Sequence, residues 1–424
     1  MFFVNLCRTF FGILAEIASR IKLPDCKYQL KIRLRGPWPE GPFLWLHGAS
    51  MGECKMLLNL AFALQEDVPR LPKILITTQK VEVLQYLQKF SREEMKRSIR
   101  EKNQEVEDNK IEYSNTANTV VLNFALAPAD NPWTMKRFFR RVKPVALILG
   151  ENELWPGFLS GMKCFTGKPS VALVSGRFRR AFPCTNFSGL GFATLQTSSD
   201  CKRFLKYAAG SISVPVSEGG NWKLLPWARR KENPPSGSFE NAAEKNIDIA
   251  FVSVHLEEIP SIKMMVLSAI HKQKKTVVIA PRRLEEVKKI REILNCWNVK
   301  CSAWPSCIPG EVALVNCFGV VGEILSRSKA AVVGGSFHKK LKIHDFWEAL
   351  QMGVPTYVGP FHRGHENAVE SLIKKRALVP LGKNGEWGLE PADKACISEA
   401  LSQEREKILN SYGQLKNYVE ELLK

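Results

Sequence analysis

A short stretch near the start of the chain combines residues that could carry out acid–base chemistry. In the run FLWLHGASMGECKMLL, at 43–58, His47 ends an apolar segment, a turn of small residues follows, and Glu53 begins an apolar helical pattern. Small residues let backbone N–H groups approach a ligand closely, and a helix N-terminus favours anions. The carboxylate is therefore either a partner of the helix dipole or a general base directed into a cleft.

Other reactive side chains also follow short apolar runs. In the first half, Glu151 and Glu153 follow the run 145–150, and Arg177 follows the run 170–175. In the second half the corresponding positions carry Ser253, His255, Arg282, Gly335 and Ser336. Acids thus predominate in one half, and basic or glycine-containing turns in the other. This division suits a base that activates an acceptor on one domain and a phosphate-bearing donor on the other.

Two further groups could contact a nucleotide. Lys223, in the turn GNWK, supplies a point charge of the kind that meets a phosphate. His344 and Glu348 have i, i+4 spacing and would share one face of a helix, where the carboxylate could accept both hydroxyls of a ribose. The same spacing also fits a surface helix with a satisfied histidine, and without further context that interpretation is favoured.

The elements that must position these residues alternate between strand-like and helix-like patterns. In the first half the expected strands are 43–47, 73–77, 120–124, 145–150 and 170–175, and in the second half they are 247–253, 276–280, 312–316, 330–334 and 354–359. Such alternation predicts parallel sheets covered on both faces. In parallel sheets ligands bind beyond the carboxyl ends of the strands, where the reactive residues occur.

Length and pattern predict two α/β domains in a chain of 424 residues. The expected divisions are an apolar N-terminal segment at 1–35, a first domain at 36–212 with a charged insertion at 91–118, and a second domain at 213–424. The first 21 residues are apolar but carry three charges. They fit an interfacial amphipathic helix, or a helix packed on the protein itself, better than a membrane span.

Composition indicates the kind of partner. The net charge of +19 predicts an anionic partner, such as a nucleotide-linked substrate or an acidic membrane surface, although a general bias toward Lys and Arg would also produce it. Nucleic-acid binding is not expected, because no recognition motif or aromatic–basic interleaving accompanies the charge. The 11 cysteines include no C-x-x-C pair, which is typical of a reduced, cytosolic chain without a zinc site.

The motifs taken together resemble the 3-deoxy-D-manno-octulosonic acid (Kdo) transferases of lipopolysaccharide biosynthesis, and most nearly the chlamydial-type members. The resemblance rests on HGASMGE, LAPADNPWTMKRFFRRVKPVALILGENELWP, SGR, SVHLEE, APRR, VVGGSF and HDFWEALQMGVPTYVGP, in this order. It implies a GT-B glycosyltransferase with two Rossmann-like domains facing a central cleft and a membrane-associating N-terminal helix. It also implies inverting transfer of Kdo from CMP-Kdo to a lipid A precursor (lipid IVA), without a metal or other cofactor, on the cytoplasmic face of the bacterial inner membrane.

The resemblance also implies roles for individual residues. Glu53 matches the family's general base. The acceptor side would comprise Ser50, Glu151, Glu153 and Arg177, and the donor side Lys223, Ser253, His255, Arg282, Gly335, Ser336, His344 and Glu348. One motif departs from the family pattern, because KIHD at 342–345 replaces G-G-H-N. Loss of both glycines would limit positive φ and close backbone approach to the donor.

Two other functions compete with this interpretation. The run GASMG at 48–52 is a literal G-x-S-x-G, which in α/β-hydrolases holds a nucleophilic serine, here Ser50. It lies on the first expected strand, however, so no earlier strand loop is available for the second oxyanion donor. The lost glycines alternatively suggest a degenerate, non-catalytic member of the transferase family.

Overall fold

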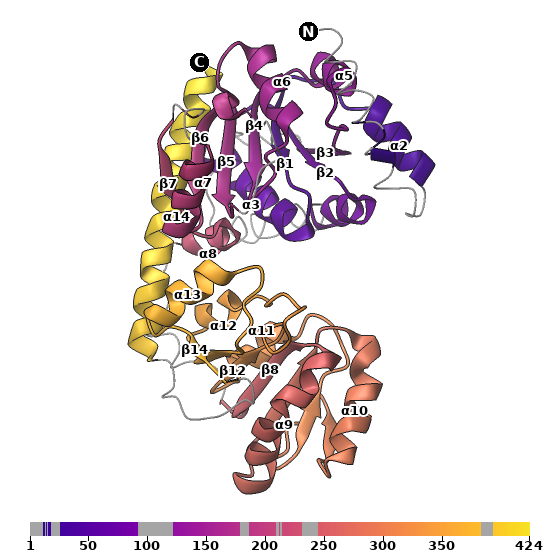
Figure 1. Ribbon diagram of the computed structural model, residues 1–424, viewed down its shortest axis with the longest axis vertical. Coiled ribbons are helices and arrows are strands. Elements are labelled where there is room, and N and C mark those ends of the chain that lie inside the picture. Colours follow the sequence, from indigo (N-terminus) through magenta and orange to yellow (C-terminus); the bar gives the residue numbers. More distant parts are fainter. Residues whose placement is uncertain are drawn as a thin grey trace, which may run out of the picture. The chain divides into compact units, whose positions relative to one another are not determined.

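The computed structural model describes residues 12, 14, 16, 17, 26–91, 122–178, 186–208, 212, 214–230, 245–382 and 393–424. The chain forms two compact units, Met1–Arg229 with Arg405–Lys424, and Arg230–Glu404. Each unit is built on its own seven-stranded sheet (Figure 1). The pairings between strands are parallel in both sheets, so the expected α/β class with two parallel-sheet domains is confirmed.

The first sheet has the strand order β3-β2-β1-β4-β5-β6-β7. Its strands are β1 (Phe43–His47), β2 (Ile74–Thr78), β3 (Leu122–Leu126), β4 (Pro144–Gly150), β5 (Val171–Gly176), β6 (Leu190–Leu195) and β7 (Val216–Glu218). The chain builds outward from β1 to β3 and then returns to the other side of β1 with β4. In open α/β sheets ligands bind beyond the carboxyl ends of the strands at such a reversal, which here lies between β1 and β4.

Successive side chains of a strand point to opposite sides of the sheet, and every residue of β1 and β2 is buried, so both faces of the sheet are covered there. Trp45 joins a core with Phe138 of α5 and Phe158 of α6. On α3, residues such as Met56 and Leu57 are also buried. The helices of this unit are α2 (Cys26–Arg35), α3 (Met51–Asp67), α5 (Pro132–Val142), α6 (Pro156–Thr166), α7 (Ser198–Tyr207) and the short α8 (Leu225–Ala228).

The second sheet has the order β10-β11-β9-β8-β12-β13-β14. Its strands are β8 (Ile249–Val254), β9 (Val277–Pro281), β10 (Cys301–Ala303), β11 (Val312–Leu314), β12 (Ala331–Val333), β13 (Thr356–Val358) and β14 (Val379–Pro380). The helices are α9 (Ile259–Leu267), α10 (Val287–Cys296), α11 (Val321–Ser326), α12 (Trp347–Gln351) and α13 (Glu366–Lys374). Here the direction of building reverses between β8 and β12, so the corresponding ligand-binding position of such a sheet lies beyond their carboxyl ends.

Four strands of the two sheets lack a strand-like signal in the sequence. They are β6, β7, β10 and β14. The last three contain only three, three and two residues, and strand β6 begins with Leu-Gly. Short strands bury few side chains, so pairing with a neighbouring strand defines them more than their own composition does.

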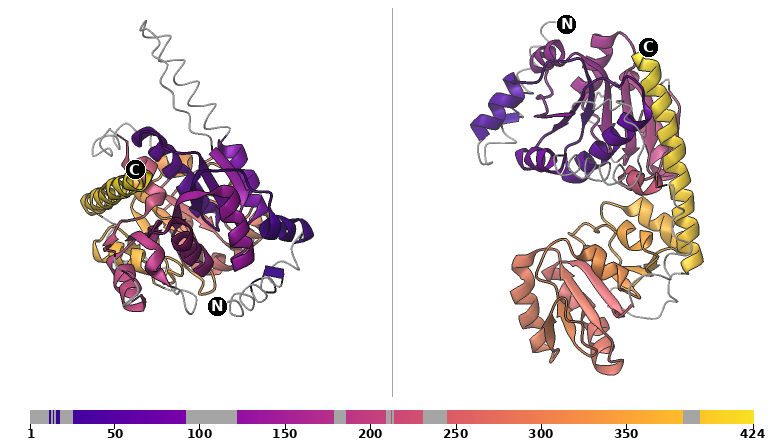
Figure 2. Two further views of the ribbon diagram at one scale, coloured as in Figure 1. Left: turned by 90° about the horizontal axis from the view of Figure 1, so that it is seen from above. Right: turned by 180° about the vertical axis from the view of Figure 1, so that it is seen from behind.

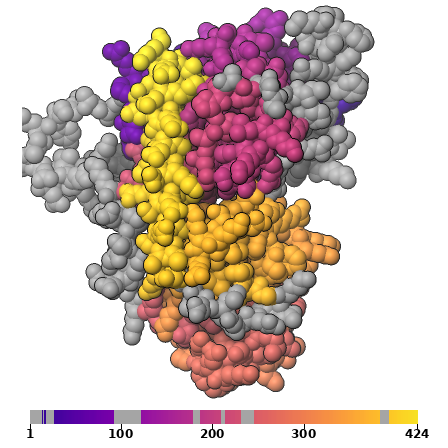
Figure 3. All heavy atoms as spheres, turned by 60° about the vertical axis from the view of Figure 1, so that its left-hand side comes forward, coloured from indigo at the N-terminus to yellow at the C-terminus, as the bar shows by residue number. Residues whose placement is uncertain are grey.

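The expected boundary at residue 212 is corrected by the way the first sheet is completed. Strand β7 pairs with β6, and Trp222, just beyond it, donates from Nε1 to the hydroxyl of Ser411 at 3.0 Å. Ser411 lies on α14 (Lys394–Leu423), whose later part packs on this unit (yellow in Figures 2 and 3). The first unit therefore extends to Arg229 and regains residues 405–424.

Most of the expected N-terminal helix and of the charged insertion lie outside the described residues. Within the described part, Glu16 forms an ion pair with the buried Arg33 of α2, so this point of the segment contacts the protein. Leu14 and Ile17 are 45% and 36% exposed. No helix among the residues that the structure describes is long and apolar enough to span a membrane.

Candidate active site

Glu53 lies in the first turn of α3, directly beyond β1. Ser50 caps this helix, and its hydroxyl accepts from the backbone N–H of Glu53 at 3.3 Å. In return, Oε2 of Glu53 accepts from the backbone N–H groups of Ala49 and Ser50, at 2.8 and 3.0 Å. This reciprocal capping box fixes the carboxylate at the helix N-terminus through one of its oxygens.

The surroundings of Glu53 favour its protonated form. The side chain is buried, and burial is the largest cause that raises its pKa; the negative charges of Glu151 and Glu153 add to the effect. The backbone bonds from Ser50 and Ala49 act in the opposite direction but do not cancel it. A carboxylate with a raised pKa is a stronger base than an ordinary one, as proton abstraction requires.

Glu151 follows β4 and has the opposite character. It is 2% exposed, and burial alone would raise its pKa, but Lys223 and Arg177 outweigh burial and lower that pKa. Nζ of Lys223 lies 2.6 Å from Oε1, and Arg177 donates to Oε2 from both Nε and a terminal nitrogen. Glu151 also has a positive φ of 53°, a conformation that costs free energy in a residue with a side chain.

Lys223 was counted with the second domain, but the structure places it in the first unit; its expected role in donor binding stays a prediction. It lies in the first unit because the backbone N–H of Trp222 donates to the hydroxyl of Ser175, at 3.1 Å, and holds the turn beside β5. A Cβ at Gly52 would come within 3.2 Å of Cε of Lys223. The glycine therefore leaves room for the lysine beside the N-terminus of α3, where it reaches Glu151.

Glu153 is held by two aromatic neighbours. Nε1 of Trp155 donates to its Oε2 at 2.6 Å, and Nε2 of His47 lies 3.4 Å from the same oxygen. His47 ends β1 and is 0% exposed. No role was assigned to His47 from the sequence, although its place in the same motif as Glu53 was an available signal. The first unit thus brings together all the residues assigned to the acceptor side.

In the second unit a buried glutamate organises the ends of β8 and β12. Glu258 is 0% exposed. Its Oε2 accepts from the backbone N–H groups of His255 and Gly335, at 3.0 and 2.8 Å, and its Oε1 from that of Phe337, at 2.9 Å. Glu258 therefore shapes the loops that follow β8 and β12, and it was not singled out from the sequence.

The substituted motif at 342–345 keeps an ordinary backbone conformation. Lys342 and Ile343 are not among the described residues with positive φ, so these positions do not require glycine. The residue that must be glycine here is Gly335, which packs against this motif and has a φ of 76°. A Cβ on Gly335 would lie 2.0 Å from the carbonyl oxygen of Lys342. The loss of both family glycines is therefore compatible with the local fold.

Ser336 contributes to the loop itself. Its hydroxyl donates to the carbonyl of Val333 at 2.6 Å and accepts from the backbone N–H of Gly359 at 2.8 Å. Ser253, at the end of β8, has a positive φ of 57°. A Cβ on Gly334 would lie 2.2 Å from the carbonyl oxygen of Ser253, so the two strand ends are in close contact.

His344 pairs with His255 and does not share a helix face with Glu348. Helix α12 begins at Trp347, after His344, so the expected i, i+4 arrangement is wrong. The Nε2 atoms of His255 and His344 lie 2.7 Å apart. Burial, with the nearby charge of Arg282 and the neighbouring His255, lowers the pKa of His344 to about 4.

The two remaining donor-side residues also lie near strand ends. The side chain of Arg282 is exposed, and its backbone N–H donates to the carbonyl of Val254 at 2.8 Å. Glu348 faces the first turn of α11, where a Cβ at Gly322 would lie 3.6 Å from its Oε1. The structure thus gathers the expected donor residues, apart from Lys223, within the second unit.

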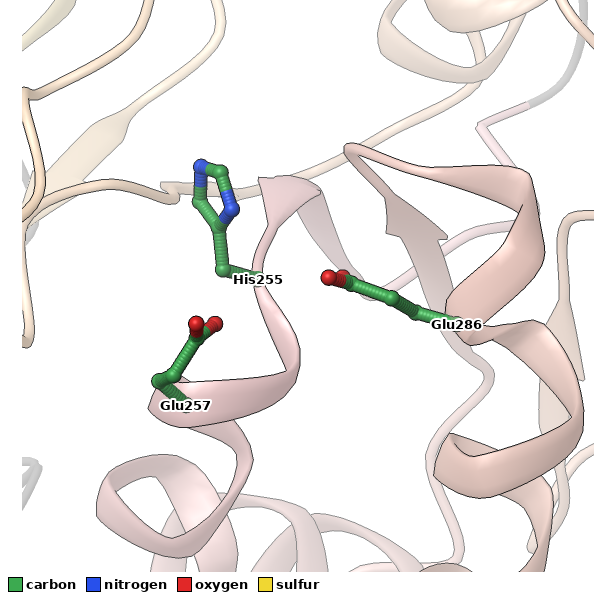
Figure 4. Close-up of side chains that lie close together, drawn as sticks. All are labelled: His255, Glu257 and Glu286. Carbon is green, nitrogen blue, oxygen red and sulfur yellow. The ribbon is translucent and has the colours of Figure 1, made fainter.

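One group of side chains in the described part of the chain has donor atoms of the kind that bind metals. These are His255, Glu257 and Glu286, whose ligand atoms lie within 4.8 Å of one another (Figure 4). Glu286 already accepts from the backbone N–H of Leu256 at 3.1 Å, and His255 already contacts His344. Glu257 is exposed, so the group lacks three preformed, free ligands.

Ser50 does not have the environment of a nucleophile. Its backbone is extended, with φ −102° and ψ 161°, and its hydroxyl caps α3. A nucleophile elbow instead holds its serine on a sharp, strained turn with an adjacent histidine. His47 is committed to Thr77 and Glu153. The geometry therefore disfavours the serine hydrolase.

The two parallel-sheet units and their strand orders define a two-domain fold of the GT-B type. A crystal structure of a glycosyltransferase from Rickettsia africae has this fold. The superposition covers 91% of this chain and 100% of the Rickettsia chain, with 10% sequence identity and a TM-score of 0.50.

The family model of the 3-deoxy-D-manno-octulosonic-acid transferases matches residues 19–207. The Aquifex aeolicus transferase of that name is 26% identical over 79% of this chain and 80% of its own. A Chlamydia trachomatis transferase of the same name is 24% identical over 81% and 76%. The expected resemblance to the Kdo transferases is confirmed.

Proposed function

We propose that this protein transfers Kdo from CMP-Kdo to a lipid A precursor, lipid IVA, with inversion at the anomeric carbon. The observation that carries the proposal is the buried Glu53 carboxylate, which lies at the N-terminus of α3, directly beyond β1, with its pKa raised. The names of the relatives in both comparisons support Kdo as the transferred sugar.

The proposed reaction is a single displacement. Glu53 takes the proton of an acceptor hydroxyl as that oxygen attacks the anomeric carbon of Kdo. The bond between that carbon and the phosphate oxygen of CMP-Kdo breaks, and CMP leaves with the electron pair. Because a hydroxyl is a weak nucleophile, proton removal supplies much of the acceleration.

The residues of the second unit would bind the donor. The turns at Ser253 and Gly335 have positive φ and are tightly packed, so the loops that would hold the donor at the strand ends are fixed in shape. Arg282 has an exposed cationic side chain at one of these ends and could neutralise phosphate charge. No metal or other cofactor is invoked, since the arginine can stabilise the leaving phosphate.

The acceptor is a lipid, so we place the reaction at the cytoplasmic face of the bacterial inner membrane. The net charge of +19 would favour an anionic surface and a phosphorylated glycolipid. The expected N-terminal amphipathic helix would add apolar contact with the membrane.

The test is transfer of radiolabelled Kdo from CMP-Kdo to lipid IVA by wild type and by Glu53→Gln. Glutamine can keep the helix cap, because its carbonyl oxygen can still accept from Ala49 and Ser50, whereas Glu53→Ala would remove it. We expect kcat to fall by about 10²- to 10⁴-fold, with little loss of stability.

The matched control is Glu66→Gln, on the exposed far end of the same helix. It should transfer Kdo at the wild-type rate. Wild-type activity of Glu53→Gln would exclude Glu53 as the base. Absence of transfer by the folded wild-type protein would instead favour the degenerate, non-catalytic family member.

A further inference from the structure

A single buried side chain joins the turns that follow β8 and β12. Glu258 is 0% exposed, and the ion pairs among the described residues do not include it. Its Oε2 accepts from the backbone N–H groups of His255 and Gly335, and its Oε1 accepts from that of Phe337. A buried polar group is costly unless it is hydrogen-bonded, so the carboxylate and the two turns are stable only in this joint arrangement.

One oxygen of Glu258 sets the distance between two histidines of the second unit. Oε2 holds the backbone of His255 directly. It also holds Gly335, and the preceding residue, Gly334, accepts from the backbone N–H of His344 at 3.1 Å. The two imidazoles approach to 2.7 Å between their Nε2 atoms. A shift of either turn away from Oε2 would therefore open the contact between the histidines.

The other oxygen holds the loop that carries Ser336. Phe337, which donates to Oε1, is 6% exposed. The hydroxyl of Ser336 donates to the carbonyl of Val333 and accepts from the N–H of Gly359, so the loop is tied to β12 and to the end of β13. Contacts that begin at Glu258 thus position four of the residues expected to bind the donor, namely His255, Gly335, Ser336 and His344.

We propose that Glu258 is a positioning residue for donor binding, which holds the turns after β8 and β12 in the arrangement that receives the nucleotide. It acts through the backbone and does not touch the nucleotide, because it is fully buried. The turns are ordered before the donor arrives, so little binding free energy is lost in ordering them. This inference rests on the proposed function, in which the second unit binds CMP-Kdo.

The variant Glu258→Gln separates the two oxygens and keeps the volume of the side chain. If its carbonyl oxygen takes the place of Oε2, the bonds from His255 and Gly335 remain, and the amide NH₂ group faces the N–H of Phe337. The reverse orientation would lose two bonds and not one, so it is disfavoured. We expect hydrogen exchange, followed by mass spectrometry, to increase in peptides covering 335–337 and to change little in those covering 253–256.

The functional measurement is affinity for the nucleotide. Isothermal titration calorimetry with CMP should give a Kd about tenfold higher for Glu258→Gln than for the wild type, as expected if the loop keeps its binding shape only about one tenth of the time. In the transfer assay, the KM for CMP-Kdo should rise by a similar factor. The kcat should stay within about twofold of the wild-type value, because substrate and transition state are weakened alike.

Glu257→Gln is the matched control, since it changes the exposed carboxylate next to Glu258 and should bind CMP as the wild type does. An unchanged Kd for CMP in Glu258→Gln would show that Glu258 only supports the fold and would overturn the proposal. A fall in kcat with an unchanged KM would contradict it equally, as would a wild-type protein that does not bind CMP. If the wild type binds CMP but transfers no Kdo, the proposed function fails, and calorimetry still decides the role of Glu258.

Discussion

Each of the two sheets has a desolvated titratable group near the carboxyl end of one of its strands, with opposite consequences for the pKa. Glu53 lies beyond β1 in the first unit, and His344 lies against the loop beyond β12 in the second. Burial is the largest cause of both pKa shifts, and it raises the pKa of Glu53 but lowers that of His344. Desolvation favours the neutral form of either group, so one physical cause produces a stronger base in one site and a neutral imidazole in the other.

The buried glutamates of the two sites differ in their partners. Glu151 binds the cationic side chains of Lys223 and Arg177, which keep it ionised. Glu258 binds three backbone N–H groups and so fixes the shape of two loops. The first site is thus organised by side-chain charge and the second by backbone hydrogen bonds.

The largest expected effect comes from removing the backbone organiser of the second site. In Glu258→Ala three buried N–H groups lose their acceptor, and each unsatisfied donor costs about 1–3 kcal/mol. We expect the free energy of unfolding to fall by about 3 kcal/mol or more, measured by urea denaturation. Glu257→Ala removes an exposed neighbouring carboxylate and is the control. Equal, small losses in both variants would show that the backbone bonds are not important.

A smaller effect is expected when the charge network of the first site is cut. Lys223→Met keeps most of the side-chain volume but removes one of the two cations on Glu151, so the pKa of Glu151 should rise. Arg177 remains, and we expect a loss of about 2 kcal/mol in the free energy of unfolding. Lys202→Met, on an exposed position of α7, is the control. Unchanged stability of Lys223→Met would mean that Arg177 alone suffices.

The smallest expected effect is the dependence of stability on pH, which tests the opposite pKa shifts of Glu53 and His344. Between pH 6.5 and about 4 the unfolded chain protonates His344 but the folded chain does not, so the second unit loses stability as the pH falls through this window. Glu53 has a raised pKa, so its contribution to stability grows as the pH falls. Hydrogen exchange at pH 7 and pH 5, corrected for intrinsic rates, should show weakened protection at 331–351 and not at 43–67.

The variant His344→Asn should remove this pH dependence. Its amide can still donate to His255, so the fold should be preserved. If residues 331–351 keep equal protection at both pH values in the wild-type protein, the neutral state of His344 has no effect on stability.

The sequence predicted the longer strands well because apolar runs of five or more residues identify them. Strands β1, β4 and β5 lie within a residue or two of the expected ranges. Strands β7 and β14 were not predicted, because they contain only three and two residues and are defined by pairing with neighbouring strands. Without β7 the end of the first unit was placed too early, and the return of α14 to that unit left no local signal.

The candidate site was predicted in part. Motif order placed Glu53, Glu151 and Glu153 together, and the structure agrees. It did not reveal that Lys223 joins them, because Lys223 follows β7 and was counted with the second half. The contact between His344 and His255 could not be predicted either, since the two residues are 89 positions apart in the chain.

The sequence by itself determined the two parallel-sheet units and the reactive residues at their strand ends, because periodicity and local turn chemistry are encoded over a few neighbouring residues. Only the tertiary structure decided the charge state and partners of those residues. The pKa of Glu53 depends on burial and on carboxylates about a hundred positions away, and the pairing of His47 with Glu153 depends on the adjacency of β1 and β4. Such effects act through space, so no local pattern records them.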